Sequence, residues 1–186
     1  MPGWRECGSD GGGEVGFLTD EMAGTTTVTD YVDVRGKIAE LGCISPKGIA
    51  LLPLNFESAT CIADLRQASE AATIKKLFLA EQILVGEITE KSQRPLYIKN
   101  KSFEWVAPTL FISASLYSQN PTCVAVALNV LANYATEFFR GMGSSNDVSL
   151  NIVLEKKEKV CKKISYQGPV EGLKGLPAII KEIGDE

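Results

Sequence analysis

Few residues in this chain of 186 have the types and spacing that catalysis or metal binding requires. The strongest combination is Asp147 with Glu155 and Lys157, the residue types of a metal-dependent nuclease. Asp147 and Glu155 stand eight positions apart on one predicted strand. At about 3.3 Å per residue they are roughly 26 Å apart, too far to share a metal ion. The spacing therefore does not predict a nuclease.

The chain contains no histidine. This excludes Ser-His-Asp and Cys-His nucleophilic catalysis and every metal site built on imidazole. It also removes the side chain that most often acts as a general base near neutral pH. An enzyme built on this sequence would have to use lysine, carboxylate, tyrosine or cysteine chemistry.

The cysteines are five in number, widely spaced, and contain no CxxC pair. An odd, scattered set predicts neither a secreted disulfide framework nor a zinc site. Cys123 stands near the start of a predicted helix, where the helix dipole could lower its pKa and make it a nucleophile. Its small apolar neighbours indicate a buried structural thiol instead. We predict no catalytic residue, no cofactor and no metal.

The charge balance disfavours nucleic acid as a partner. The net charge is −4 and the pI is about 5.1, whereas nucleic-acid binding needs clustered lysine and arginine. Basic residues do gather over 156–163, but glutamates interrupt them, which is typical of a solvated hairpin tip. The glycine clusters lack the GK[ST] ending of a phosphate loop.

The longest uncharged stretch runs from Trp105 to Thr136 and breaks at 118–121, where Asn120 and Pro121 are typical of a helix start. It predicts an αα-hairpin of helices over 108–117 and 121–140. A membrane span needs roughly 20 apolar residues, and the first helix is too short. We expect a hairpin buried in a soluble fold. The alternatives are an oligomer interface and a pore-forming hairpin over 105–140.

The C-terminal third has the clearest pattern. Apolar residues alternate from Val148 to Leu154, which predicts a strand, followed by a turn over 156–159 and a return strand to Tyr166. A closing helix is predicted over 173–183. Earlier segments predict helices over 31–41 and 62–84, a strand over 49–55 that Pro53 places at an edge or a bulge, and a brief strand over 96–98.

Together these elements predict an α+β fold. In this fold the apolar αα-hairpin packs with the C-terminal β-hairpin and closing helix, over a small mixed or antiparallel sheet. Residues 1–24 are expected to form a disordered glycine-rich leader and residues 25–186 a single α+β domain. Met22 is an alternative start of the chain.

No motif identifies a family, so the functional prediction is mainly one of exclusion. Phe103, Glu104 and Trp105 precede the hairpin and are the candidate surface for a partner. We expect a non-catalytic protein-interaction or regulatory module that binds a protein partner or its own copies. The N-terminus lacks an apolar signal region, so the expected compartment is the cytoplasm. The alternatives are a membrane-active effector and a histidine-independent enzyme.

Overall fold

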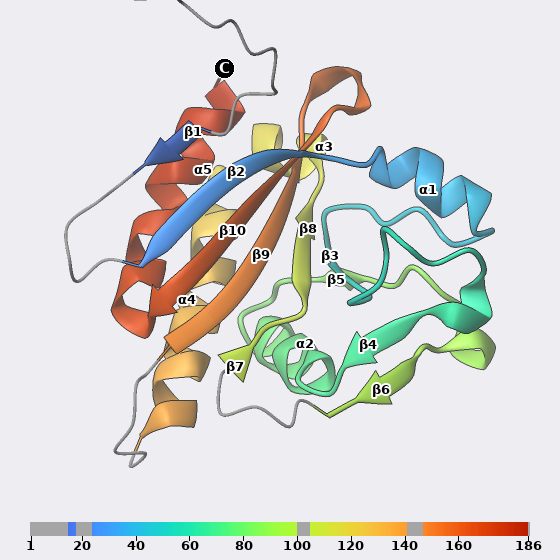
Figure 1. Ribbon diagram of the computed structural model, residues 1–186, viewed down its shortest axis with the longest axis horizontal. Helices are drawn as coiled ribbons and strands as arrows, with labels where there is room; N and C mark the ends of the chain where they lie inside the picture. Colours follow the sequence, from blue (N-terminus) through green and yellow to red (C-terminus); the bar gives the residue numbers. More distant parts are fainter. Residues whose placement is uncertain (1–14, 18–23, 100–104, 141–146, 186) are drawn as a thin grey trace, which may run out of the picture.

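The computed structural model describes residues 15–17, 24–99, 105–140 and 147–185 (Figure 1). An eight-stranded mixed sheet has the strand order β1-β2-β10-β9-β8-β3-β5, with β7 paired beside β9, and β4 and β6 form a separate two-stranded sheet. The strands are β1 Val15–Phe17, β2 Thr25–Tyr31, β3 Ile49–Leu52, β4 Arg66–Ala68, β5 Val85–Gly86, β6 Leu96–Ile98, β7 Trp105–Val106, β8 Thr109–Ile112, β9 Asp147–Glu155 and β10 Cys161–Pro169. The predicted α+β class is confirmed.

Five α-helices surround the sheet in the described part of the chain. They are α1 Val34–Glu40, α2 Ala71–Ala80, α3 Ala114–Gln119, α4 Pro121–Phe139 and α5 Leu176–Asp185. Short 3-10 turns cover Ile62–Asp64, Lys91–Gln93, Lys157–Lys159 and Val170–Gly175. In Figure 1, α4 and α5 lie across one face of β9 and β10, whereas α1 lies beyond the end of β2.

The directions of the central strands bring several chain segments to one end of the sheet. β8 runs parallel to β9, while β10 and β3 run antiparallel to these neighbours. β8 therefore ends at Ile112 beside the end of β9 at Glu155. We call this side of the molecule the carboxyl end of the sheet.

The core has two parts, one on each face of the sheet. Leu110 and Ile112 of β8 belong to the part covered by α2, α4 and α5, while Phe111 between them belongs to the part covered by α1. Successive side chains of a strand point to opposite faces, so β8 contributes to both parts. All three residues are completely buried.

Helix α4 and the β9–β10 hairpin are where the sequence predicted them. The side chain of Asn120 accepts a hydrogen bond from the Cys123 N–H (3.1 Å), and Pro121 begins the helix. Seven residues of α4 are buried in the core: Val124, Ala127, Leu128, Leu131, Ala132, Ala135 and Phe139. Among the described residues, α4 is also the one helix that is long and apolar enough to span a bilayer, and it only just meets the criterion for apolar character. Its buried side packs on the sheet, and 39% of its apolar stretch is buried.

The first helix of the predicted hairpin is shorter than expected. Residues Thr109–Ile112 form β8, and α3 begins only at Ala114, where the Ser113 hydroxyl accepts the Leu116 N–H (3.3 Å). A strand buried on both faces has a continuous apolar sequence, which cannot be told from a buried helix by its periodicity.

Three other boundaries differ from the sequence prediction. The helix predicted over 62–84 is confined to α2, because 62–64 form a 3-10 turn and 66–68 form β4. The helix predicted from residue 31 starts at Val34, since Asp33, not Asp30, accepts the capping hydrogen bond. β3 lies between β8 and β5 and is not an edge strand, because Pro53 follows its last residue. Most of the predicted leader, 1–24, lies outside the described residues and stays a prediction.

Candidate functional site

The most exposed apolar strand in the described part of the chain is β6. Leu96, Tyr97 and Ile98 are 65%, 49% and 45% exposed. β6 pairs with β4 alone among the described strands, and the two lie apart from the main sheet, at the lower right of Figure 1. An edge strand with exposed apolar side chains is unusual, because proteins normally protect such edges.

The backbone of β6 has one free side. β6 is parallel to β4, with Tyr97 opposite Gln67, and the Ser69 N–H donates to the Ile98 carbonyl (3.1 Å). Backbone groups of successive residues in a strand point to alternate sides. Ile98 faces β4, so the N–H and C=O of Tyr97 face the open side. An added strand could pair there without disturbing the existing sheet.

A pocket of about 270 Å³ lies next to this edge. Gln67 is buried within its wall, where its amide nitrogen donates to the Leu51 carbonyl (3.1 Å) and its amide oxygen accepts the Ala68 N–H (2.9 Å). The lining residues are Leu51, Pro53, Gln67, Ala72, Lys75, Lys76, Glu87, Ile88, Thr89, Arg94, Pro95 and Tyr97. Both the nitrogen and the oxygen of the Gln67 amide are thus hydrogen-bonded to the backbone, which fixes the position of this side chain in the wall.

The charged groups around this pocket leave it positive. Lys75 forms an ion pair with Glu87 (2.7 Å), so these two charges cancel. Lys76 and Arg94 have no ion-pair partner within the described ranges. The edge of β6 and its pocket therefore present two free cations beside an exposed apolar strand, and Lys99 adds a third just after the strand.

The partner surface predicted from the sequence is described only in part. Phe103 and Glu104 lie outside the described residues. For Trp105 only the backbone is described, and this residue of β7 pairs with Val148 of β9. The strand over 96–98 was predicted from the sequence, but its exposure was not. Its flanking Arg94-Pro95 and Lys99 were the available signal, since charges and proline next to an apolar strand are typical of edges.

The candidates for catalysis are not brought together. Asp147 and Glu155 begin and end β9, and Glu155 is held in an ion pair with Arg35 (2.7 Å). Burial raises the pKa of the Cys123 thiol, the opposite of what a nucleophile needs. In the described ranges, no group of three or more cysteine, aspartate or glutamate side chains could hold a metal ion.

Comparison with known proteins adds no relative. No protein-family model, curated protein or solved structure matches this chain. The geometry of the β6 edge and its pocket is therefore the basis for any function proposed for this protein.

Proposed function

We propose that this protein is a non-catalytic interaction module that binds an extended, acidic segment of a partner protein along β6. The observation that carries the proposal is the free edge at Tyr97, with exposed apolar side chains on either side of it. Addition of a strand to a sheet edge is a recurrent mode of peptide recognition, in which the main chain supplies affinity and side-chain pockets supply specificity.

The apolar side chains of β6 give such a segment something to bury. Covering a leucine or isoleucine side chain completely is worth about 1.5–3 kcal/mol, and Leu96 and Ile98 are only about half-buried at present. Binding also costs entropy, so a few buried side chains and two backbone hydrogen bonds predict modest affinity. This suits a regulatory contact.

The positive charges favour an acidic partner. Arg94 and Lys99 flank β6, and Lys76 stands at the pocket, so a segment carrying Glu or Asp would gain complementary contacts. A carboxylate side chain entering the pocket would meet Lys76 and Arg94 together. We also propose that this interaction takes place in the cytoplasm, in agreement with the odd number and wide spacing of the cysteines.

The test uses a fluorescent eight-residue peptide of alternating Glu and Val, with a Lys-Val peptide as its matched control. We expect the Glu-Val peptide to bind with a dissociation constant in the range of about 10–500 μM and the Lys-Val peptide to bind at least about tenfold more weakly. Absence of Glu-Val binding at about 1 mM, or equal binding of both peptides, would overturn the proposal.

Two variants locate the binding to β6. Tyr97→Pro removes the outward N–H but leaves the pairing with β4 intact, and Tyr97→Ala is its matched control with the N–H retained. We expect Tyr97→Pro to weaken Glu-Val binding by at least about fivefold relative to Tyr97→Ala. Lys76→Gln with Arg94→Gln should weaken it without any backbone change. If the protein instead dimerises through β6, sedimentation of these variants will show it and the partner assignment fails.

A further inference from the structure

A second and larger cleft lies at the carboxyl end of the sheet, far along the chain from β6. Its volume is about 870 Å³, within the range of about 300–1,000 Å³ typical of small-molecule sites. The walls are α3, the tip of the β9–β10 hairpin and the end of α5. The lining residues are Ala114, Ser115, Tyr117, Ser118, Leu154, Glu155, Lys156, Lys157, Glu158, Val160, Lys162, Gly184 and Asp185.

One wall of the cleft is fixed by a partly buried ion pair. Arg35 donates from Nε to Glu155 Oε1 (2.7 Å) and from Nη2 to Glu155 Oε2 (3.0 Å). Glu155 Oε2 also accepts the Ala114 N–H (3.0 Å), and Arg35 Nη1 donates to the Ser45 hydroxyl (2.6 Å). Hydrogen bonds to Glu155 thus connect the end of β9 with helix α1 and with the first residue of α3. Both oxygens of Glu155 are engaged, so its charge is compensated within the protein.

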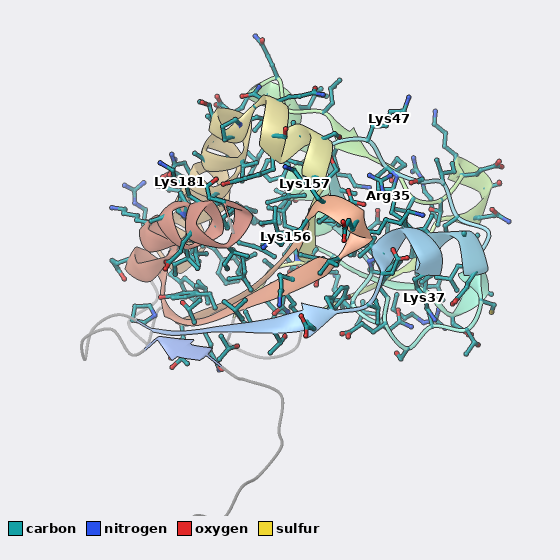
Figure 2. The ribbon with its side chains drawn as sticks, turned by 90° about the horizontal axis from the view of Figure 1, so that it is seen from above. Arg35, Lys37, Lys47, Lys156, Lys157 and Lys181 are labelled. Carbon is teal, nitrogen blue, oxygen red and sulfur yellow. The ribbon has the colours of Figure 1, made fainter. Side chains whose placement is uncertain are left out.

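Two of the three lysines that line the cleft have no ion-pair partner among the described residues. Lys156 and Lys157 have no ion-pair partner among the described residues, whereas Lys162 is paired with Asp30 (2.6 Å). The other two lining carboxylates, Glu158 and Asp185, are exposed to solvent, as is Lys157, so the solvent screens all three charges. Figure 2 looks onto this end and shows Lys156 and Lys157 on the hairpin tip between Lys181 of α5 and Arg35 of α1.

Hydroxyl groups stand opposite these lysines. Ser115, Ser118 and Tyr117 line the cleft from α3. The Tyr117 hydroxyl lies 3.3 Å from the Lys181 carbonyl and 3.4 Å from an Asp185 carboxylate oxygen, which ties α3 to α5. Serine hydroxyls and lysine ammonium groups are the donors that phosphate oxygens accept from in proteins.

The backbone of the tip is in an uncommon conformation. Glu158 and Lys159 have φ of 65° and 64°, in the left-handed region that non-glycine residues seldom adopt. The Lys156 N–H donates to the Val160 carbonyl (2.7 Å) and closes this turn, so the conformation holds the lysines at the mouth of the cleft.

We infer that this cleft binds a small phosphate-bearing molecule, with Lys156 and Lys157 facing its anionic group and the Ser115 and Ser118 hydroxyls of α3 donating to it. The inference is independent of the β6 proposal, because the two sites share no residue. The rest of the ligand would occupy the apolar part of the cleft, beside Leu154, Val160 and the Tyr117 ring.

The test is calorimetric titration of the full chain with pyrophosphate at constant ionic strength. We expect a dissociation constant below about 1 mM and one binding site. Lys156→Gln with Lys157→Gln should weaken binding by at least about tenfold, and Ser115→Ala with Ser118→Ala by a smaller factor. The matched control is Lys91→Gln with Lys174→Gln, which removes two exposed lysines that line neither the cleft nor the β6 pocket and should leave binding unchanged.

Two results would overturn the inference. One is the absence of binding by pyrophosphate at several millimolar. The other is equal loss of affinity in the cleft variant and in the control variant, which would show that net charge alone attracts the anion. Thermal unfolding of each variant in the absence of pyrophosphate shows whether it is folded, and Lys156→Arg with Lys157→Arg, which keeps both charges, should bind.

Discussion

Two strands of this protein have almost the same sequence and opposite surroundings. β8 contains Leu110-Phe111-Ile112, completely buried, and β6 consists of Leu96-Tyr97-Ile98, each about half exposed. β8 pairs with strands on both sides, whereas β6 is the outer strand of a two-stranded sheet. Composition is therefore a poor guide to role here. In β8 the apolar side chains hold the fold together, and in β6 we propose that they bind a partner.

The largest expected difference between the strands is in stability. Phe111→Ala removes a ring that fills the core between β8 and α1, and we expect it to lower the free energy of unfolding by about 3–5 kcal/mol. Tyr97→Ala at the equivalent place in β6 should change it by less than about 1 kcal/mol. Urea denaturation of both variants measures the comparison. Similar losses would show that β6 is part of the folding core.

The next largest effect belongs to the ion pair at the end of β9. Glu155→Ala leaves the Arg35 guanidinium and the Ala114 N–H without their acceptor, and should cost about 2 kcal/mol. Glu158→Ala removes an exposed glutamate from the adjacent tip and should have little effect. If the two variants are equally stable, the ion pair does not stabilise this end of the sheet.

The same ion pair makes a prediction about pH. Burial by itself would raise the pKa of Glu155, but the hydrogen bonds from Arg35 and from the Ala114 N–H outweigh it and lower the pKa below its ordinary value of 4.5. Because the pKa of Glu155 is lower in the folded protein than in the unfolded chain, the stabilisation that ionised Glu155 provides is complete above about pH 4.5. It is lost as the pH falls through the pKa of Glu155 in the folded protein. We expect the stability difference between the wild type and Glu155→Gln to shrink below pH 4.5. A constant difference down to pH 2 would contradict this.

A smaller effect is expected at the hairpin tip. Glycine adopts a positive φ at no steric cost, so Glu158→Gly should stabilise the protein by up to about 1 kcal/mol. Gly42, just after α1, has nearly the same φ (66°) as Glu158 and is already a glycine. The reverse change, Gly42→Ala, should therefore destabilise the protein by a similar amount. Thermal unfolding measures both, and a loss of stability in Glu158→Gly would show that the tip is not strained.

The smallest effect on stability is expected at Leu96. Leu96→Ser should change the free energy of unfolding by less than about 0.5 kcal/mol, because the side chain is 65% exposed. Its effect should be seen in binding, as weaker affinity for the Glu-Val peptide. A stability loss of several kcal/mol would mean that β6 is covered in the native protein.

Patterns in the sequence predicted some elements well because their signals are local. The alternation through β9 and β10 has a period of two, and the Asn120-Pro121 start of α4 satisfies backbone groups within one turn. β2 was missed, although its run of Thr25 to Tyr31 is rich in threonine and therefore typical of a strand. β8 could not have been recognised, because its burial on both faces hides the alternation that marks a strand.

The α+β class, the C-terminal hairpin and helix α4 could all be predicted from local sequence patterns, and the lack of histidine excluded imidazole chemistry. The three-dimensional packing was needed to show that Leu110-Phe111-Ile112 is buried while Leu96-Tyr97-Ile98 is exposed, and that Arg35 meets Glu155 across 120 residues. The physical reason is that local patterns set backbone conformation, whereas exposure and ion pairing depend on which distant segments pack against each residue.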